Sequence, residues 1–148
     1  MDEYLTFTLC GDRYAFSIKD VDSVVEASGF TRIPKAARYV RGIMNLRGSV
    51  IPVVDLRLKL EMPARGDGAR ESVIVLAFEE ESGTRLVGAV ADEVHEVLAL
   101  DESRIEEPPA LASAPEGAFV SGIGKSDSGF IVILDAAAAY VGRAEASA

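Results

Sequence analysis

The feature that most constrains the fold of this chain is an internal repeat with an offset of 80 residues. Tyr39-Val40-x-Gly42-Ile43 returns as Phe119-Val120-x-Gly122-Ile123, and Ile51-x-Val53-Val54-Asp55 returns as Ile131-x-Ile133-Leu134-Asp135. A valine-rich segment and an Arg-Ile pair precede these motifs in both halves, in the same order. Chance explains any single match but not the ordered set, so the chain is predicted to contain two similar units.

Short strands are the elements that both units favour. Apolar residues alternate with polar ones at Leu5, Phe7 and Leu9, which is the period of a half-buried strand. Hairpins are predicted over residues 43–54, turning at Arg47-Gly48, and over residues 72–90. Residues 18–25 have apolar spacing that fits either one or two helical turns or a strand with a bent start.

The predicted architecture is mainly β, with two small β-barrels and short helices. Strands of this number must close or pack, because open apolar edges aggregate. We expect one domain over residues 1–148, with a groove between the barrels. The first barrel is expected over roughly residues 14–72, and the second over roughly residues 73–142 together with the N-terminal strand.

The charge balance and apolar segment lengths restrict the possible partners. The net charge is −9, so nucleic acid and anionic membrane surfaces are disfavoured, since both attract cationic proteins. No segment approaches ~18 uninterrupted apolar residues, so no direct membrane insertion is expected. The single cysteine, Cys10, cannot form an internal disulfide, which fits a reducing cytoplasm.

Residues with catalytic potential are few and scattered. His95 is the only histidine and Cys10 the only cysteine, and no nucleophile–base pattern accompanies either of them. Asp55 and Asp135 are possible paired carboxylates, but each precedes a short helical segment, so helix N-capping explains both. We therefore expect no enzymatic activity, cofactor or metal. A ligand-binding β-barrel and a small hydrolase are the alternatives from other classes.

Arg47 at the tip of the first predicted hairpin has two interpretations. Arginine is enriched at interface hot spots because it combines a flat apolar body with five hydrogen-bond donors. A turn arginine without any partner is equally common at protein surfaces, and physical reasoning on this residue alone leaves both interpretations open.

The segment from Arg41 to Gly48 (RGIMNLRG), followed by residues 51–57 (IPVVDLR), closely resembles the signature of the CheW family of chemotaxis coupling proteins. The resemblance extends to residues 14–34, 87–98 and 122–140. It implies two five-stranded, SH3-like β-barrels and no catalysis. It also implies an adaptor role between the cytoplasmic tip of methyl-accepting chemoreceptors and the regulatory domain of a CheA-type histidine kinase. An adaptor of a non-flagellar chemosensory pathway is the close alternative.

The resemblance also implies which residues contact each partner. The receptor contact of the family lies in the groove between the barrels, and the kinase contact lies largely on barrel ends. Carried over to this sequence, the receptor-binding residues are Ile18, Val21, Val24, Asn45 and Arg47, and the kinase-binding residues are Pro34, Tyr39, Arg41 and Arg47. Core packing is the alternative role of the valines.

This sequence departs from the family pattern in three places. Ser23 occupies the position of a glutamate that can pair with the hairpin arginine, so Asp22 or Glu26 substitutes or Arg47 is unpaired. Residues 35–38 read Lys-Ala-Ala-Arg instead of the usual stretch with a further proline and an acidic or neutral residue. This change alters the charge of a surface rim, and such charges influence which partner binds. The terminal helical segment is mostly alanine and ends early.

Overall fold

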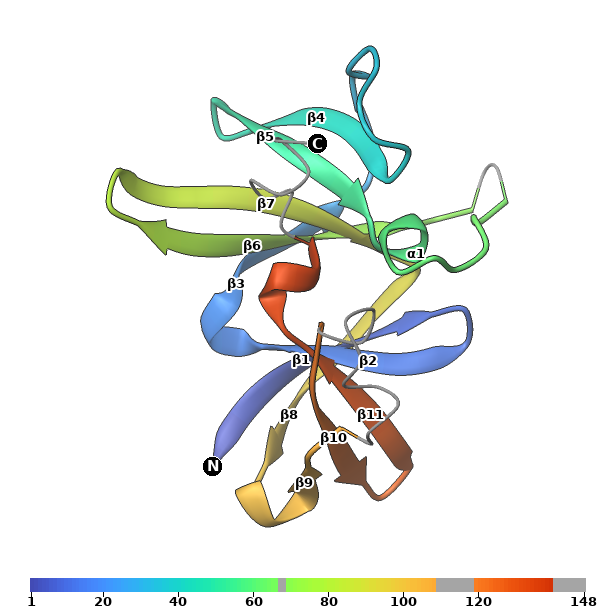
Figure 1. Ribbon diagram of the computed structural model, residues 1–148, viewed down its shortest axis with the longest axis vertical. Helices are drawn as coiled ribbons and strands as arrows, with labels where there is room; N and C mark the ends of the chain where they lie inside the picture. Colours follow the sequence, from blue (N-terminus) through green and yellow to red (C-terminus); the bar gives the residue numbers. More distant parts are fainter. Residues whose placement is uncertain (67–68, 109–118, 140–148) are drawn as a thin grey trace.

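Two curled β-sheets, stacked one above the other, form the protein in a computed structural model that describes residues 1–66, 69–108 and 119–139 (Figure 1). The upper sheet has the order β3-β6-β7-β5-β4, and the lower sheet has the order β8-β1-β2-β11-β10-β9. The mainly β, two-barrel prediction is confirmed. The lower sheet has six strands rather than five, because the two-residue strand β9 extends it. Among the described residues, no helix is long and apolar enough to cross a membrane.

The upper barrel, called barrel 1, is one continuous stretch of chain. Its elements are β3 (Val21–Glu26), β4 (Val40–Leu46), β5 (Ser49–Asp55), helix α1 (Leu56–Lys59), β6 (Ser72–Glu80) and β7 (Gly83–Ala91). The lower barrel, called barrel 2, comprises β1 (Asp2–Leu9), β2 (Asp12–Ser17), β8 (Glu93–Leu100), β9 (Ile105–Glu106), β10 (Val120–Ser126) and β11 (Gly129–Leu134). Within residues 1–66, 69–108 and 119–139, three short 3-10 helices accompany the strands: η1 (Ile18–Asp20), η2 (Glu102–Arg104) and η4 (Ala136–Ala139).

Strand pairing reproduces the sequence repeat in detail. In barrel 1, Gly42 pairs with Val53, and the register shifts just before that pair. In barrel 2, Gly122 pairs with Ile133 after the same shift, and both partners are offset by 80 residues. Each bulge bends its strand so that the hairpin can curl around the barrel. The predicted two-unit organisation therefore describes real structural equivalents.

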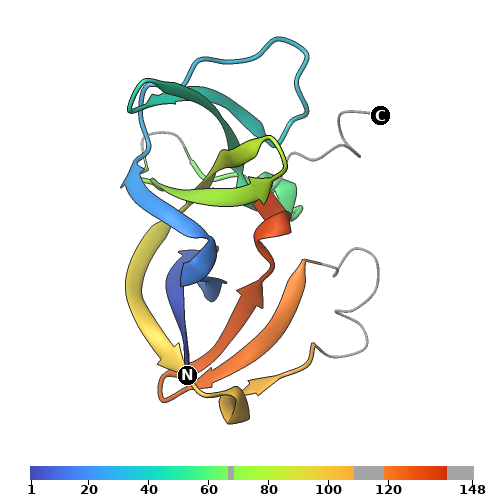
Figure 2. The same cartoon turned by 90° about the vertical axis from the view of Figure 1, so that its left-hand side faces the viewer.

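The barrels do not coincide with the repeats, and this differs from the expected boundary at residues 72–73. The hairpin of β6 and β7 pairs with β3 and β5 of barrel 1, while β2 pairs with β11 of barrel 2. Each repeat therefore contributes its first hairpin to the barrel built from the rest of the other repeat, through parallel pairing with the last strand of that other repeat, β5 or β11. Barrel 1 lies, in the sequence, between β2 and β8 of barrel 2 (Figure 2).

A shared apolar core joins the two barrels. Phe7 and Phe16 of barrel 2 belong to the same buried cluster as Leu56, Ile74 and Leu76 of barrel 1. The two phenylalanine rings stack with centroids 5.1 Å apart. Complete burial of each large apolar side chain stabilises the fold by about 1.5–3 kcal/mol. Separating the barrels would expose these side chains to water and lose that stabilisation. Smaller clusters fill the interior of each barrel.

Residues 18–25 combine both structures that the sequence pattern allowed. The 3-10 helix η1 begins after Ser17, whose hydroxyl accepts a hydrogen bond from the backbone N–H of Lys19 at 3.3 Å. The chain then enters β3 at Val21 with extended backbone angles. The bent start places β3 in barrel 1 directly after β2 of barrel 2.

Candidate functional site

The tip of the β4–β5 hairpin is a tight turn with two left-handed residues. Arg47 has a φ of 50° and Gly48 a φ of 87°, which is the backbone pattern of a type I′ turn. The Asn45 side-chain oxygen accepts a hydrogen bond from the Gly48 N–H at 2.9 Å. Asn45 therefore shapes the turn, and the turn projects Arg47, whose side chain is 66% exposed.

An ion pair fixes the Arg47 guanidinium against strand β3. Arg47 Nη2 lies 2.6 Å from a carboxylate oxygen of Asp22, and the Ser23 hydroxyl donates to the same carboxylate at 3.0 Å. The hydrogen bond from Arg47, followed by that from Ser23, lowers the pKa of Asp22. β3 and β4 are the two edges of the barrel 1 sheet, so this contact links one edge to the other. Of the alternatives that the sequence left open for Arg47, the structure selects pairing with Asp22.

The apolar residues assigned to the receptor contact divide into two groups. Ile18 and Val21 are half-buried and pack against the shared core, so they also have a structural role. Val24 is 42% exposed, and so is Val97, its repeat equivalent on β8. Both valines belong to the valine-rich segments that precede the repeated motifs in the two halves, but Val97 was not among the predicted receptor-binding residues. That match was the signal available for finding it.

A hollow of about 450 Å³ lies where the two barrels meet, beside the exposed end of β3. Val24 and Val25 line it from barrel 1, and Asp92 and Glu93 line it from the start of β8. Ile18, Val21, Asn45 and Arg47 are not among its lining residues. The structure therefore brings only Val24 of the assigned receptor-binding residues into this hollow.

Apart from Arg47 at the hairpin tip, the residues assigned to the kinase contact lie on or beside the loop between β3 and β4. They are not equally available to a partner. Pro34 is exposed, and Tyr39 is half-buried with the Lys59 ammonium 4.2 Å from its ring centroid. Arg41 turns inward and donates to Asp55 at 2.8 Å and to Glu71 at 3.1 Å. Burial lowers the pKa of Arg41, but the hydrogen bonds that it donates to Glu71 and Asp55, together with the charges of these carboxylates, outweigh burial and raise the pKa overall. Arg41 thus holds the barrel end together.

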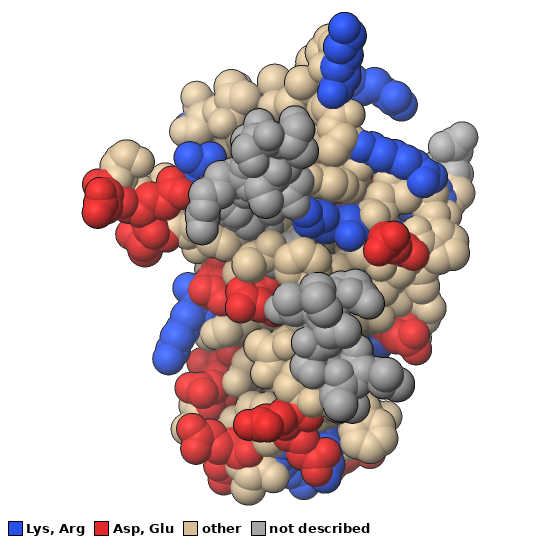
Figure 3. Space-filling view, in the orientation of Figure 1, with Lys and Arg blue, Asp and Glu red and all other residues tan. Residues whose placement is uncertain are grey.

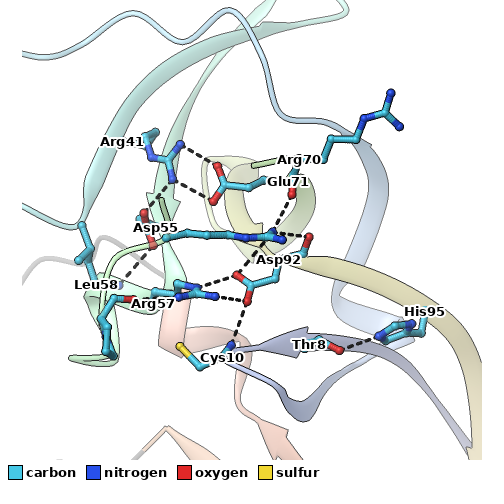
Figure 4. A network of polar contacts seen from close by, with 12 residues as sticks. Thr8, Cys10, Arg41, Asp55, Arg57, Leu58, Arg70, Glu71, Asp92 and His95 are labelled. Atoms are coloured by element: carbon cyan, nitrogen blue, oxygen red, sulfur yellow. Dashed lines mark hydrogen bonds and ion pairs between the residues drawn. The ribbon is translucent and has the colours of Figure 1, made fainter. Parts of the chain in front are cut away.

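A second buried ion pair, drawn in Figure 4, connects the barrels at the β7–β8 junction. The Asp92 side chain is 8% exposed and that of Arg57 is 14% exposed. Arg57 donates twice to the Asp92 carboxylate, with Nε 2.7 Å from one oxygen, and the Cys10 N–H donates to the other at 2.9 Å. Helix α1 of barrel 1 is therefore tied to the β1–β2 turn of barrel 2. Sequence reasoning missed this junction.

The residues considered for catalysis have structural explanations. Asp55 accepts from the Leu58 N–H at 3.3 Å and Asp135 accepts from the Ala137 N–H at 2.9 Å, so the capping prediction is confirmed for both. His95 Nε2 lies 2.6 Å from the Thr8 hydroxyl, across the β1–β8 pair. Cys10 is exposed at a turn with a positive φ. The described surface offers a projecting arginine, exposed valines and hollows, and the fold defines the class of the protein as a β protein of two joined barrels.

Comparison with known proteins identifies the family within that class. The model of the CheW-like domain matches residues 3–141. "Chemotaxis protein CheW" of Klebsiella aerogenes is 32% identical over 133 residues, which cover 90% of this chain and 78% of that protein. Its counterpart in Bacillus subtilis is 30% identical, covering 91% of this chain and 84% of that protein. The chain belongs to the CheW-like domain family.

A solved structure supports the same conclusion. The crystal structure of the scaffolding protein TtCheW from Thermoanaerobacter tengcongensis superposes with a TM-score of 0.79 and 35% sequence identity. The superposition covers 90% of this chain and 88% of that chain. The resemblance inferred from the hairpin signature therefore extends to the whole two-barrel fold.

Proposed function

We propose that this protein is a non-enzymatic chemotaxis adaptor that couples the cytoplasmic tips of chemoreceptors to a CheA-type histidine kinase. The observation that carries the proposal is family membership over nearly the whole chain, with relatives named as chemotaxis and scaffolding proteins. The exposed, oriented Arg47 tip supports a binding role, because an arginine held in place loses less entropy on contact with a partner. The proposed location is the cytoplasm, at receptor arrays beneath the inner membrane.

The receptor tip is proposed to contact the side of barrel 1 formed by η1, β3 and the β4–β5 hairpin. Val24 offers apolar surface there, and Ile18 and Val21 extend it towards the shared core. Receptor tips are helical, and a helix can place an apolar face against such a surface. Asn45 and Arg47 border the apolar residues and supply polar contacts.

The kinase regulatory domain is proposed to contact the end of barrel 1 near the loop between β3 and β4. Pro34 and Tyr39 offer direct contacts, and Arg47 lies on the neighbouring hairpin. Arg41 has a positioning role, since its guanidinium is engaged by Asp55 and Glu71. The adaptor would then contact receptor and kinase through two surfaces of one barrel that share Arg47.

Binding of the purified protein to the kinase, with and without a receptor tip fragment, tests this function. Micromolar or tighter binding to both, with a receptor-dependent change in kinase autophosphorylation, is the expected result. Val24→Asp is expected to weaken receptor binding, because it places a charge on the apolar contact. Phe130→Asp is the control, since Phe130 is also an exposed apolar residue, at 68%, but lies on β11 of barrel 2. Binding to neither protein would refute the proposal.

A further inference from the structure

The loop between β3 and β4, residues 27–39, carries charged side chains of one sign only. It carries Arg32, Lys35 and Arg38 and no acidic residue, although the chain as a whole has 24 acidic and 15 basic side chains. All three cations are exposed, and within the described residues none of them takes part in an ion pair or a side-chain hydrogen bond. We call these three residues the basic rim.

Charge is segregated between the two barrels. Residues 18–91, which include barrel 1, contain 11 basic and 10 acidic side chains, whereas the remainder of the chain contains 4 basic and 14 acidic ones. Barrel 1 is thus near neutral, with net charge +1, and the rest carries −10. Figure 3 shows basic side chains at the upper end of the molecule, and acidic ones over the lower barrel and at the left-hand tip of the upper barrel. The basic rim therefore projects a positive potential away from the bulk of the negative charge.

A hollow beneath the basic rim offers space for a side chain of the partner. Its volume is about 360 Å³, and its lining includes Arg32, Ile33 and Arg38. Ile33 is 41% exposed and places apolar surface among these cations. An apolar centre surrounded by cations matches the anatomy of a protein interface, where a buried anchor is bordered by polar contacts.

We propose that the basic rim binds an acidic face of the kinase regulatory domain and thereby selects which kinase this adaptor serves. This inference rests on the proposed coupling function and adds the chemistry of the partner surface. A protein face fits better than lipid or nucleic acid, because three cations on a chain of net charge −9 give weak attraction to a polyanion. Carboxylates around one apolar side chain would pair with the rim while the apolar group enters the hollow.

The test measures the dissociation constant for the kinase regulatory domain between about 50 and about 300 mM NaCl, the range over which surface charges become screened. Lys35→Glu/Arg38→Glu is compared with Arg104→Glu/Lys125→Glu, which changes the net charge equally but lies in barrel 2. Wild type is expected to bind more weakly as salt rises. The rim variant is expected to bind about tenfold more weakly or worse at low salt, with a flatter salt dependence, and the control within about threefold of wild type.

The outcomes separate the two proposals. If the rim variant binds the kinase with the same affinity and the same salt dependence as wild type, the basic-rim inference is overturned. The coupling function then still stands. Failure of wild type to bind the kinase at any salt concentration overturns the coupling function and the inference that rests on it. A third outcome is that wild type binds phosphatidylglycerol vesicles in a salt-sensitive way and the rim variant does not, while kinase binding is the same for both. That result assigns the rim to a membrane surface and also overturns the inference. The substituted side chains are exposed, so circular dichroism is expected to show an intact fold.

Discussion

Removing the Asp92 carboxylate should destabilise the protein more than any substitution at an exposed carboxylate. In Asp92→Asn, the shape of the side chain is kept, but the Arg57 guanidinium loses its charged partner while its side chain stays 86% buried. Breaking a buried ion pair from one side costs about 3–5 kcal/mol, because the remaining charge is left uncompensated. We expect a value near the lower limit, about 3 kcal/mol, since Asn retains one acceptor for Arg57 or for the Cys10 N–H.

Urea unfolding monitored by circular dichroism measures this loss directly. For a chain of this size, about 3 kcal/mol corresponds to a fall in Tm on the order of 10 °C. Asp127→Asn is the matched control, because Asp127 has a 99% exposed side chain and pairs with Arg104 only at 3.5 Å. The control should change the free energy of unfolding by less than about 0.5 kcal/mol. A loss below about 1 kcal/mol for Asp92→Asn would refute the reasoning.

The pH dependence provides an independent check on the same residue. Burial raises the pKa of Asp92, but hydrogen bonds from Arg57 and the Cys10 N–H, with the nearby Arg57 and Arg65 charges, outweigh it and lower the pKa overall. A carboxyl group with a lowered folded-state pKa stabilises the protein above its unfolded-state pKa of about 3.9, and this stability is lost as pH falls through the folded-state pKa. Wild type should therefore lose stability more steeply than Asp92→Asn below about pH 4. Parallel curves would contradict the prediction.

Three further substitutions test other parts of the fold. A Cβ on Gly42 would lie 2.3 Å from the Thr31 carbonyl oxygen, whereas a Cβ on Gly129, which also has a positive φ, meets nothing within 4 Å. Gly42→Ala should therefore lower the free energy of unfolding in urea by at least about 2 kcal/mol more than Gly129→Ala does. Equal losses would argue against the clash. Asp55→Ala removes a helix cap and a buried ion pair, so it should lower the free energy of unfolding by about 3 kcal/mol. Asp135→Ala removes only an exposed cap and should lower it by about 1 kcal/mol, and thermal unfolding measures the difference. Asp22→Ala should change the free energy of unfolding by less than about 1 kcal/mol, because its ion pair with Arg47 is exposed. It should still weaken kinase binding, because this pair orients the hairpin tip. Unchanged binding in a titration would contradict this role.

Local features of the fold were predictable because neighbouring residues determine them. The turn at Arg47-Gly48, the caps at Asp55 and Asp135 and the alternation in β1 all follow from side chains within a few positions of one another. Which strands pair over long distances was not predictable in the same way. Parallel pairing of β5 with β7 and of β11 with β2 leaves no mark on either strand beyond its apolar character, so β2 was expected in barrel 1 and the β6–β7 hairpin in barrel 2.

The candidate site shows the same limit. The Arg47 tip is part of a contiguous motif, whereas Arg57 and Asp92 are 35 positions apart and meet only in the folded state. Charged residues are expected at the surface, so nothing in the sequence indicated that this pair is buried. Arg41 was assigned to the kinase contact from its place in the motif, and its inward orientation depends on Glu71, which no local pattern connects to it.

The placement of barrel 1 between two strands of barrel 2 sets an order for folding during synthesis. All five strands of barrel 1 have left the ribosome once residue 91 and a short tail have emerged, so this barrel can close first. The hairpin of β1 and β2, although made earliest, must wait for β8 and β11 before it finds its partners. During this interval the apolar faces of Phe7 and Phe16 have only the completed barrel to cover them. We therefore expect the β1–β2 hairpin to pack against the completed barrel 1 until β8 and β11 have been synthesised.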